Sequence, residues 1–118
     1  MPEVVRHGTT SVVVGNCSIG LAFGAQRNEQ QDPIVDCFAR VENIPKSVLA
    51  KTADKAVWTK PREYLEHLDQ LPLAANMAPF LPHSMLRIEV MGLQDSISRQ
   101  PIATELKRMV GILEEALE

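Results

Sequence analysis

The sequence predicts an α+β fold, a two-layer sandwich in which about four mainly antiparallel strands carry helices on one face. Three observations predict it. Residues 9–14 are dense in β-branched side chains, and short segments at 17–24, 33–41 and 84–91 alternate bulky apolar residues with polar or small ones, as half-buried strands do. Gly15-Asn16 separates the first two segments, which favours an N-terminal β-hairpin. Residues 101–117 repeat apolar side chains at helical spacing, which predicts a C-terminal amphipathic helix.

The N-terminal part is expected to hold a flexible arm and the hairpin. Residues 1–8 have no clear period and are interpreted as the arm. Thr9–Val14 is rich in β-branched residues, which suit a strand. The second strand, Cys17–Gly24, has one bulky face and one nearly bare face formed by Ser18, Gly20, Ala22 and Gly24. Another part of the protein, or a ligand, is expected to approach that bare face closely.

The middle of the chain is expected to hold a loop, a strand and two helices. Gln26–Asp32 is polar and reads as a loop, after which Pro33–Val41 alternates like a strand. Residues 43–58 then show a helical pattern with Pro45 near its start, where proline is tolerated. A second helix is predicted from Pro61 to Leu71, with apolar residues three and four apart.

The segment from Leu71 to Pro82 is strongly apolar, yet three prolines interrupt it. Proline blocks a long helix or a central strand, so we expect an irregular segment. Ser84–Met91 again alternates like a strand and is followed by Gly92. The final helix places Leu106, Val110 and Leu113 in one apolar stripe that is expected to cover an apolar surface.

Size and composition predict one domain over residues 1–118. The net charge of −3 offers no overall attraction to nucleic acid. No apolar run approaches the ~18 residues of a membrane span, and the N-terminus has no charged leader followed by an apolar stretch. We therefore expect a cytoplasmic protein without membrane contact, for which nucleic acid is an unlikely partner.

Motifs for catalysis, metals and cofactors are missing from the sequence. Glycine-rich phosphate loops are absent, and His7, His67 and His83 are too scattered for a zinc site. Cys17 and Cys37 fall in predicted strands among apolar neighbours and are expected to be buried, unreactive thiols. The sequence predicts no catalytic residue, no metal and no cofactor, and it leans away from an enzyme.

The leading hypothesis is a small accessory protein that acts through protein contacts and forms a homodimer. It rests on the missing catalytic motifs and on an apolar segment longer than a loop needs. Six residues are predicted at the contact: Trp58, Tyr64, Leu73, Met77, Phe80 and Leu81.

Two other hypotheses remain open. A small-molecule binding protein or enzyme would use the bare sheet face at Ser18, Gly20 and Ala22 as the floor of a pocket. An anion or nucleic-acid binder would act through a basic cluster with an aromatic residue inside it, formed by Lys51, Lys55, Lys60 and Trp58.

Overall fold

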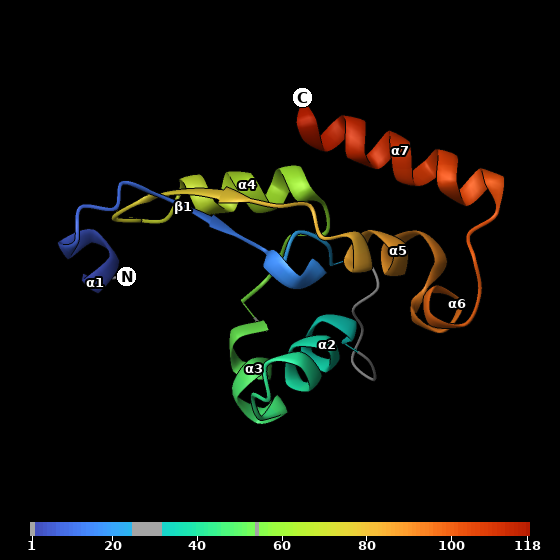
Figure 1. The fold of residues 1–118 in the computed structure, drawn as a ribbon, viewed down its shortest axis with the longest axis horizontal. Helices are drawn as coiled ribbons and strands as arrows, with labels where there is room; N and C mark the ends of the chain where they lie inside the picture. Colours follow the sequence, from blue (N-terminus) through green and yellow to red (C-terminus); the bar gives the residue numbers. More distant parts are fainter. Residues whose placement is uncertain (1, 25–31, 54) are drawn as a thin grey trace.

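The chain is mostly helical, and its described part contains one small parallel sheet (Figure 1). The structure is a computed structural model and describes residues 2–24, 32–53 and 55–118. The elements in order are α1 (Pro2–Arg6), β1 (Ser11–Val14), the short 3₁₀ turn η1 (Asn16–Ser18), α2 (Pro33–Val41), α3 (Lys46–Ala53), α4 (Pro61–Asp69), β2 (Asn76–Pro79), α5 (His83–Met91), α6 (Leu93–Ser98) and α7 (Ala103–Leu117).

The predicted four-stranded, mainly antiparallel sandwich is wrong, and so is the N-terminal hairpin. β1 has the predicted position, but the chain leaves it through Gly15 and Cys17, both with left-handed backbone angles (φ 91° and 61°). These angles form the turn η1 instead of a two-residue hairpin turn. The following residues, 19–24, are not assigned to a strand, although Ile19, Ala22 and Phe23 are buried.

The predicted strand Pro33–Val41 is the helix α2. Asp32 caps its N-terminus, because one side-chain oxygen accepts hydrogen bonds from the backbone N–H groups of Ile34 and Val35 at 3.1 and 3.2 Å. Pro33 occupies the first turn, where its missing N–H costs nothing. The loop predicted over residues 26–32 lies, except for Asp32, outside the described residues.

The predicted strand Ser84–Met91 is also a helix, α5. Its buried residues Met85, Ile88 and Met91 are three apart, so they share one helical face. Gly92 has a φ of 78°, a conformation that suits glycine, and its N–H donates to the carbonyl of Ile88 at 2.8 Å. The alternation of apolar residues over 84–91 fits both the period of a strand and the period of a helix. Packing against the core selects the helix.

The three remaining predicted helices are confirmed, the first of them in part. α4 and α7 lie where helical spacing places them, and α3 occupies part of the predicted helix 43–58. The irregular segment 71–82 contains β2, and the predicted arm at residues 1–8 contains the short helix α1.

The two strands pair in parallel although more than sixty residues separate them. Ser11 lies opposite Asn76 and Val14 opposite Pro79. The N–H of Phe80 extends the pairing by donating to the carbonyl of Val14 at 2.8 Å. Parallel strands require a long crossover connection, and here that connection carries α2, α3 and α4, so the unit is a β-α-β arrangement.

The core lies between the segment after η1, the residues before α4 and the inner face of α5. Trp58 is buried, and its indole N–H donates to the carbonyl of Leu21. Its ring centroid lies 5.1 Å from that of Tyr64 and 4.8 Å from that of His67. The remaining buried members of this cluster are Ala22, Phe23, Ile34, Met85, Leu86, Ile88, Met91 and Met109.

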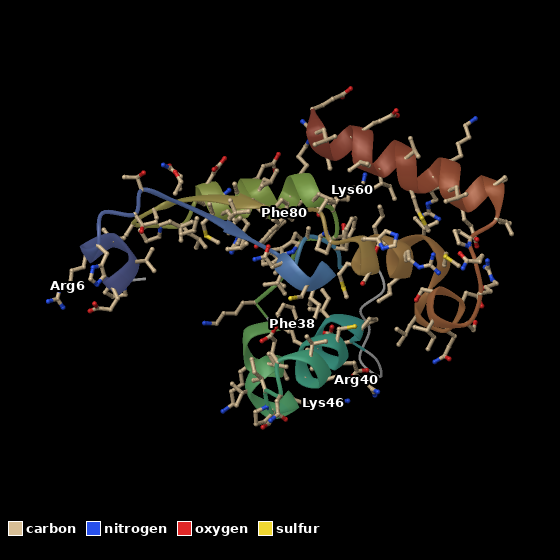
Figure 2. All side chains as sticks on the ribbon, in the orientation of Figure 1. Arg6, Phe38, Arg40, Lys46, Lys60 and Phe80 are labelled. Atoms are coloured by element: carbon tan, nitrogen blue, oxygen red, sulfur yellow. The ribbon has the colours of Figure 1, made fainter. Side chains whose placement is uncertain are left out.

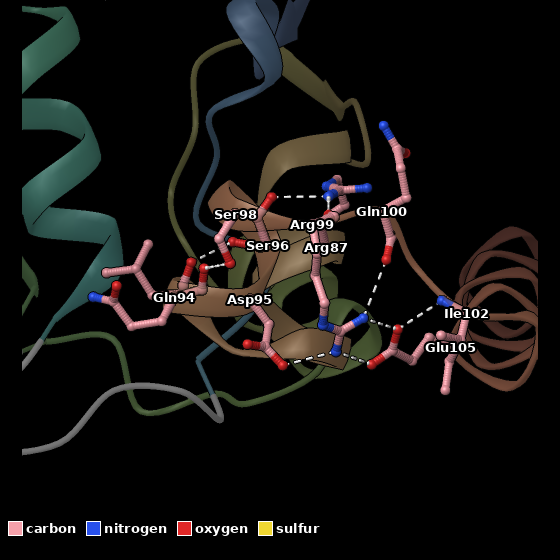
Figure 3. Close-up of polar contacts among 10 residues, drawn as sticks. Arg87, Gln94, Asp95, Ser96, Ser98, Arg99, Gln100, Ile102 and Glu105 are labelled. Atoms are coloured by element: carbon pink, nitrogen blue, oxygen red, sulfur yellow. Dashed lines mark hydrogen bonds and ion pairs between the residues drawn. The ribbon is translucent and has the colours of Figure 1, made fainter.

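A polar network joins α5, α6 and α7 (Figure 3). The Arg99 guanidinium donates to both carboxylate oxygens of Glu105, at 2.7 and 2.8 Å, and to Asp95 at 2.7 Å. Arg87 on α5 donates to the backbone carbonyls of Ser96 and Arg99 at 2.8 and 3.0 Å. Glu105 also accepts the N–H of Ile102 at 2.9 Å, which caps α7. This network fixes the start of α7.

Glu105→Gln is expected to lower the melting temperature at pH 7 by a few degrees. The Arg99 hydrogen bonds and then the Ile102 N–H lower the pKa of Glu105 from 4.5 to about 2. A lowered native pKa stabilises the fold above the unfolded-state pKa, and this stabilisation is lost as the pH falls through the native pKa. The difference between parent and variant should therefore shrink between about pH 4.5 and pH 2 in thermal scans monitored by circular dichroism.

The matched control is Glu66→Gln on an exposed position of α4. It should stay close to the parent at every pH, since isolated surface substitutions have small effects. If Glu105→Gln differed from the parent in melting temperature by the same amount at pH 7 and at pH 2, the role given to this carboxylate would be contradicted.

Candidate functional site

Both strands end at the same pocket. Because β1 and β2 are parallel, their carboxyl ends share one edge of the sheet, and this edge is where ligands bind in open parallel sheets. A pocket of about 360 Å³ lies there. We call it the strand-end pocket. Its lining residues come from the end of β1 with the turn and segment after it, from α2 and the residue that follows it, from α4, and from β2 and the residue that follows it: Val14, Gly15, Asn16, Cys17, Ile19, Gly20, Leu21, Ala22, Phe38, Glu42, Tyr64, Met77, Pro79 and Phe80.

The turn after β1 presents a thiol at this pocket. A Cβ atom on Gly15 would lie only 3.2 Å from the carbonyl oxygen of Phe80, so glycine fits this close approach. Cys17 has a φ of 61° and is exposed. The prediction that both thiols are buried is therefore wrong: Cys17 is exposed, and Cys37 on α2 is half-buried. Burial and then the nearby Asp36 carboxylate raise the pKa of Cys37.

Cys17→Gly is expected to raise the free energy of unfolding by about 0.5–1 kcal/mol. A left-handed conformation costs a residue with a side chain about 1–2 kcal/mol, while glycine adds an entropic cost of about 0.5–1 kcal/mol. Urea denaturation measures the difference. Cys37→Gly, inside α2, is the control and should destabilise the protein by about 1 kcal/mol or more. A destabilising Cys17→Gly would show that the thiol makes a stabilising contact that outweighs the strain.

The bare face predicted at Ser18, Gly20 and Ala22 is covered mainly by the chain itself. A Cβ atom on Gly20 would lie 2.5 Å from Cγ of Pro82, whose side chain is fully buried. Ala22 is also buried, and Ser18 lies in η1. Gly20 and Ala22 still line the strand-end pocket, so this part of the predicted floor is at the site.

The strand-end pocket is largely apolar. Among its described lining residues Glu42 is the only charged side chain, and none is a histidine, lysine or arginine. Phe38 and Phe80, labelled in Figure 2, line it from α2 and from the residue after β2. Burial raises the pKa of Tyr64, so its phenol is neutral at physiological pH. The pocket therefore suits a neutral group, for which Tyr64 or Asn16 offers a hydrogen-bond donor.

The residues predicted at a protein contact do not form one surface. Met77, Phe80 and Tyr64 meet at the strand-end pocket, and Phe80 and Tyr64 also line the neighbouring hollow beside α4 and α7 that contains Leu81. Phe80 and Leu73 are exposed, at 56% and 37%, while Trp58 and Tyr64 belong to the core. Only part of the predicted set is thus accessible to a partner.

The predicted basic cluster is spread over several elements. Lys51 lies in α3, and Lys60, just before α4, has its ammonium 4.0 Å from the Glu115 carboxylate. Lys55 lines a separate apolar cavity of about 440 Å³ together with Trp58. Because the Trp58 ring is buried, it is not presented for stacking against a base.

The described residues contain neither a metal-binding cluster nor a membrane-spanning helix. In residues 2–24, 32–53 and 55–118, no three histidine, cysteine, aspartate or glutamate side chains gather as a metal-binding group. No helix in this part of the chain has the length and apolar character needed to cross a membrane.

Comparison with known proteins finds similarity to segments of larger proteins. An uncharacterized protein of Mycobacterium tuberculosis is 40% identical over 119 residues, covering 98% of this chain and 19% of the relative; one from Mycobacterium bovis matches equally. N-acyl-D-aspartate deacylase of Alcaligenes xylosoxydans is 31% identical over 114 residues, covering 97% of this chain and 20% of the enzyme. The chain therefore spans about a fifth of these relatives. No protein family profile and no solved structure matches it.

Proposed function

We propose that the strand-end pocket binds the acyl group of N-acylated amino acids and serves a protein that hydrolyses their amide bond. The observation that carries the proposal is the meeting of two parallel strand ends at one apolar pocket with an exposed thiol. The similarity to a protein named N-acyl-D-aspartate deacylase supports the class of substrate.

The lining of the pocket decides which part of such a substrate it fits. The described lining residues offer apolar surface and no cation, so they suit an uncharged acyl chain and its amide and do not suit the carboxylates of an amino acid. In the reaction, water cleaves the amide to a carboxylic acid and a free amine. We assign binding of the acyl group to this pocket. We assign the activation of water to groups in other parts of such a protein.

The sheet itself supports a role within a larger assembly. Ser11, Val13, Asn76 and Ala78 are exposed on one face, with Val13 at 57%. Parallel sheets are normally covered on both faces, and a two-stranded sheet is marginal alone. We propose that another part of a larger protein covers this face. An exposed thiol at Cys17 also fits a reducing compartment such as the cytoplasm.

Ligand protection of Cys17 tests the pocket. Iodoacetamide should alkylate Cys17 faster than Cys37, because Cys17 is exposed and the pKa of Cys37 is raised. N-hexanoyl-D-aspartate should slow alkylation of Cys17 at least about threefold at saturation and leave the rate at Cys37 unchanged. Mass spectrometry of the digested protein measures both rates.

Free D-aspartate is the control ligand, because it has the carboxylates and lacks the acyl group. It should give no protection. Equal protection by D-aspartate would contradict binding through the acyl group, and no protection by any N-acylated compound would contradict the pocket's role.

A second candidate function is protein contact near the same edge, supported by the exposed side chain of Phe80. Phe80→Ser should then weaken association with a partner or a second copy while the melting temperature stays near that of the parent. Val57→Ser is a matched control, since Val57 is 82% exposed, precedes Trp58 in a loop and does not line the strand-end pocket. Equal effects of both changes on association would argue against this surface.

A further inference from the structure

Helix α7 has two apolar faces, and the chain buries one of them. Met109 is 6% exposed and packs on the core, with Ile112 half-buried beside it. The neighbouring face carries Leu106, Val110, Leu113 and Leu117, which are 49%, 52%, 40% and 79% exposed. We call this face the outer stripe. Figure 1 shows α7 at the periphery of the fold, away from α2 and α3.

The spacing within the outer stripe is that of a coiled-coil seam. Its members are separated by four, three and four residues, the alternation of the a and d positions in a heptad pattern, which keeps such side chains facing a partner helix. The stripe continues into an apolar hollow beside α4, lined in part by Leu65, Phe80, Leu113 and Leu117. A continuous apolar surface of this kind is typical of a surface that a partner covers.

We propose that α7 of a second copy covers the outer stripe and that the two helices run antiparallel. In the register that we propose, Leu106 packs against Leu117 of the other copy, and Val110 packs against Leu113. The two-fold axis repeats each of these contacts, which gives four apolar layers. Such an interface is self-complementary, as two-fold symmetric dimers require.

Charge pattern selects the antiparallel orientation. Lys107 and Glu114 lie on the same flank of the stripe, seven residues apart. Antiparallel pairing brings each Lys107 opposite Glu114 of the other copy, which gives two ion pairs. Parallel pairing would place Met109 or Ala116 opposite these charges and leave them unmatched across the seam. The other flank, Met109 and Ala116, carries no charge that would oppose close approach.

Sedimentation equilibrium of the full chain under reducing conditions, across a dilution series, tests the dimer. The parent should dissociate on dilution. Val110→Glu should raise the dimer dissociation constant at least about tenfold, because it places two like charges in the seam. Val57→Glu, an exposed apolar position outside the stripe, should leave the constant unchanged. Circular dichroism checks that each variant keeps its helices.

Charge exchange tests the orientation. Lys107→Glu and Glu114→Lys should each raise the dissociation constant about twofold to fivefold at low salt, and the double variant should restore it. A parent that is monomeric at every concentration would overturn the proposal and leave the stripe to another segment or protein. A dimer that tolerates Val110→Glu would also overturn it, and a dimer for which the double variant fails to restore affinity would overturn the antiparallel orientation.

Discussion

Trp58→Ala is expected to lower the free energy of unfolding by about 3–5 kcal/mol, the usual cost of truncating a buried aromatic residue. Trp58 is 8% exposed and lies at the centre of the core cluster. It contacts Tyr64 and His67 on α4 and donates its indole N–H to the carbonyl of Leu21. The variant therefore loses the contact that joins α4 to the segment after η1.

Trp58→Phe separates packing from hydrogen bonding. It keeps an aromatic ring and removes the donor, which should cost about 1–3 kcal/mol because the Leu21 carbonyl loses its partner. Urea denaturation followed by circular dichroism measures both variants. Trp58→Ala would contradict the position of Trp58 in the core if its free energy of unfolding lay within about 1 kcal/mol of that of the parent. A difference of that size is a typical effect of any single substitution.

Gly24→Ala is expected to lower the free energy of unfolding by about 1–3 kcal/mol, as overpacking does. A Cβ atom at Gly24 would lie 2.4 Å from the backbone carbonyl oxygen of Trp58. Backbone atoms cannot rotate away as a side chain can, so one segment must shift. The shift strains the hydrogen bond from the Gly24 N–H to the carbonyl of Thr59, which measures 3.2 Å.

Gly111→Ala is the matched control for this change. Gly111 lies in α7, and a Cβ atom added there would have no neighbour within 4 Å outside the helix's own backbone. Alanine in a helix interior gains about 0.5–1 kcal/mol over glycine. The two glycine substitutions should therefore shift the urea midpoint in opposite directions. A stabilising Gly24→Ala would contradict the close approach of residues 24 and 58.

Local sequence patterns predict the elements whose period is unambiguous. α7 spans fifteen residues with regular apolar spacing, and α4 begins at a proline, so both are predicted correctly. Pro33–Val41 and Ser84–Met91 are each only about two helical turns long, and alternating apolar residues over so few positions fit a strand and a helix equally. The cap at Asp32 and the terminating Gly92 are the signals that favour helices.

The parallel pairing of β1 and β2 cannot be predicted from local pattern. The apolar, proline-interrupted segment before α5 contains β2, and nothing nearby in the sequence indicates that it joins β1. When that pairing is not known, Cys17 is predicted to lie within a strand, whereas it is an exposed residue at a strand end. The Gly15-Asn16-Cys17 sequence after β1 is the available signal, and it fits a hairpin turn as well as the turn η1.

The most direct test of the strand-end pocket is an NMR titration of the full chain with N-hexanoyl-D-aspartate, which reports on every backbone amide. We expect concentration-dependent shifts that cluster at Gly15, Asn16, Gly20 and Phe80, around the carboxyl ends of the two strands. Shifts that cluster elsewhere, or a spectrum that does not change at saturating ligand, would contradict the proposed site.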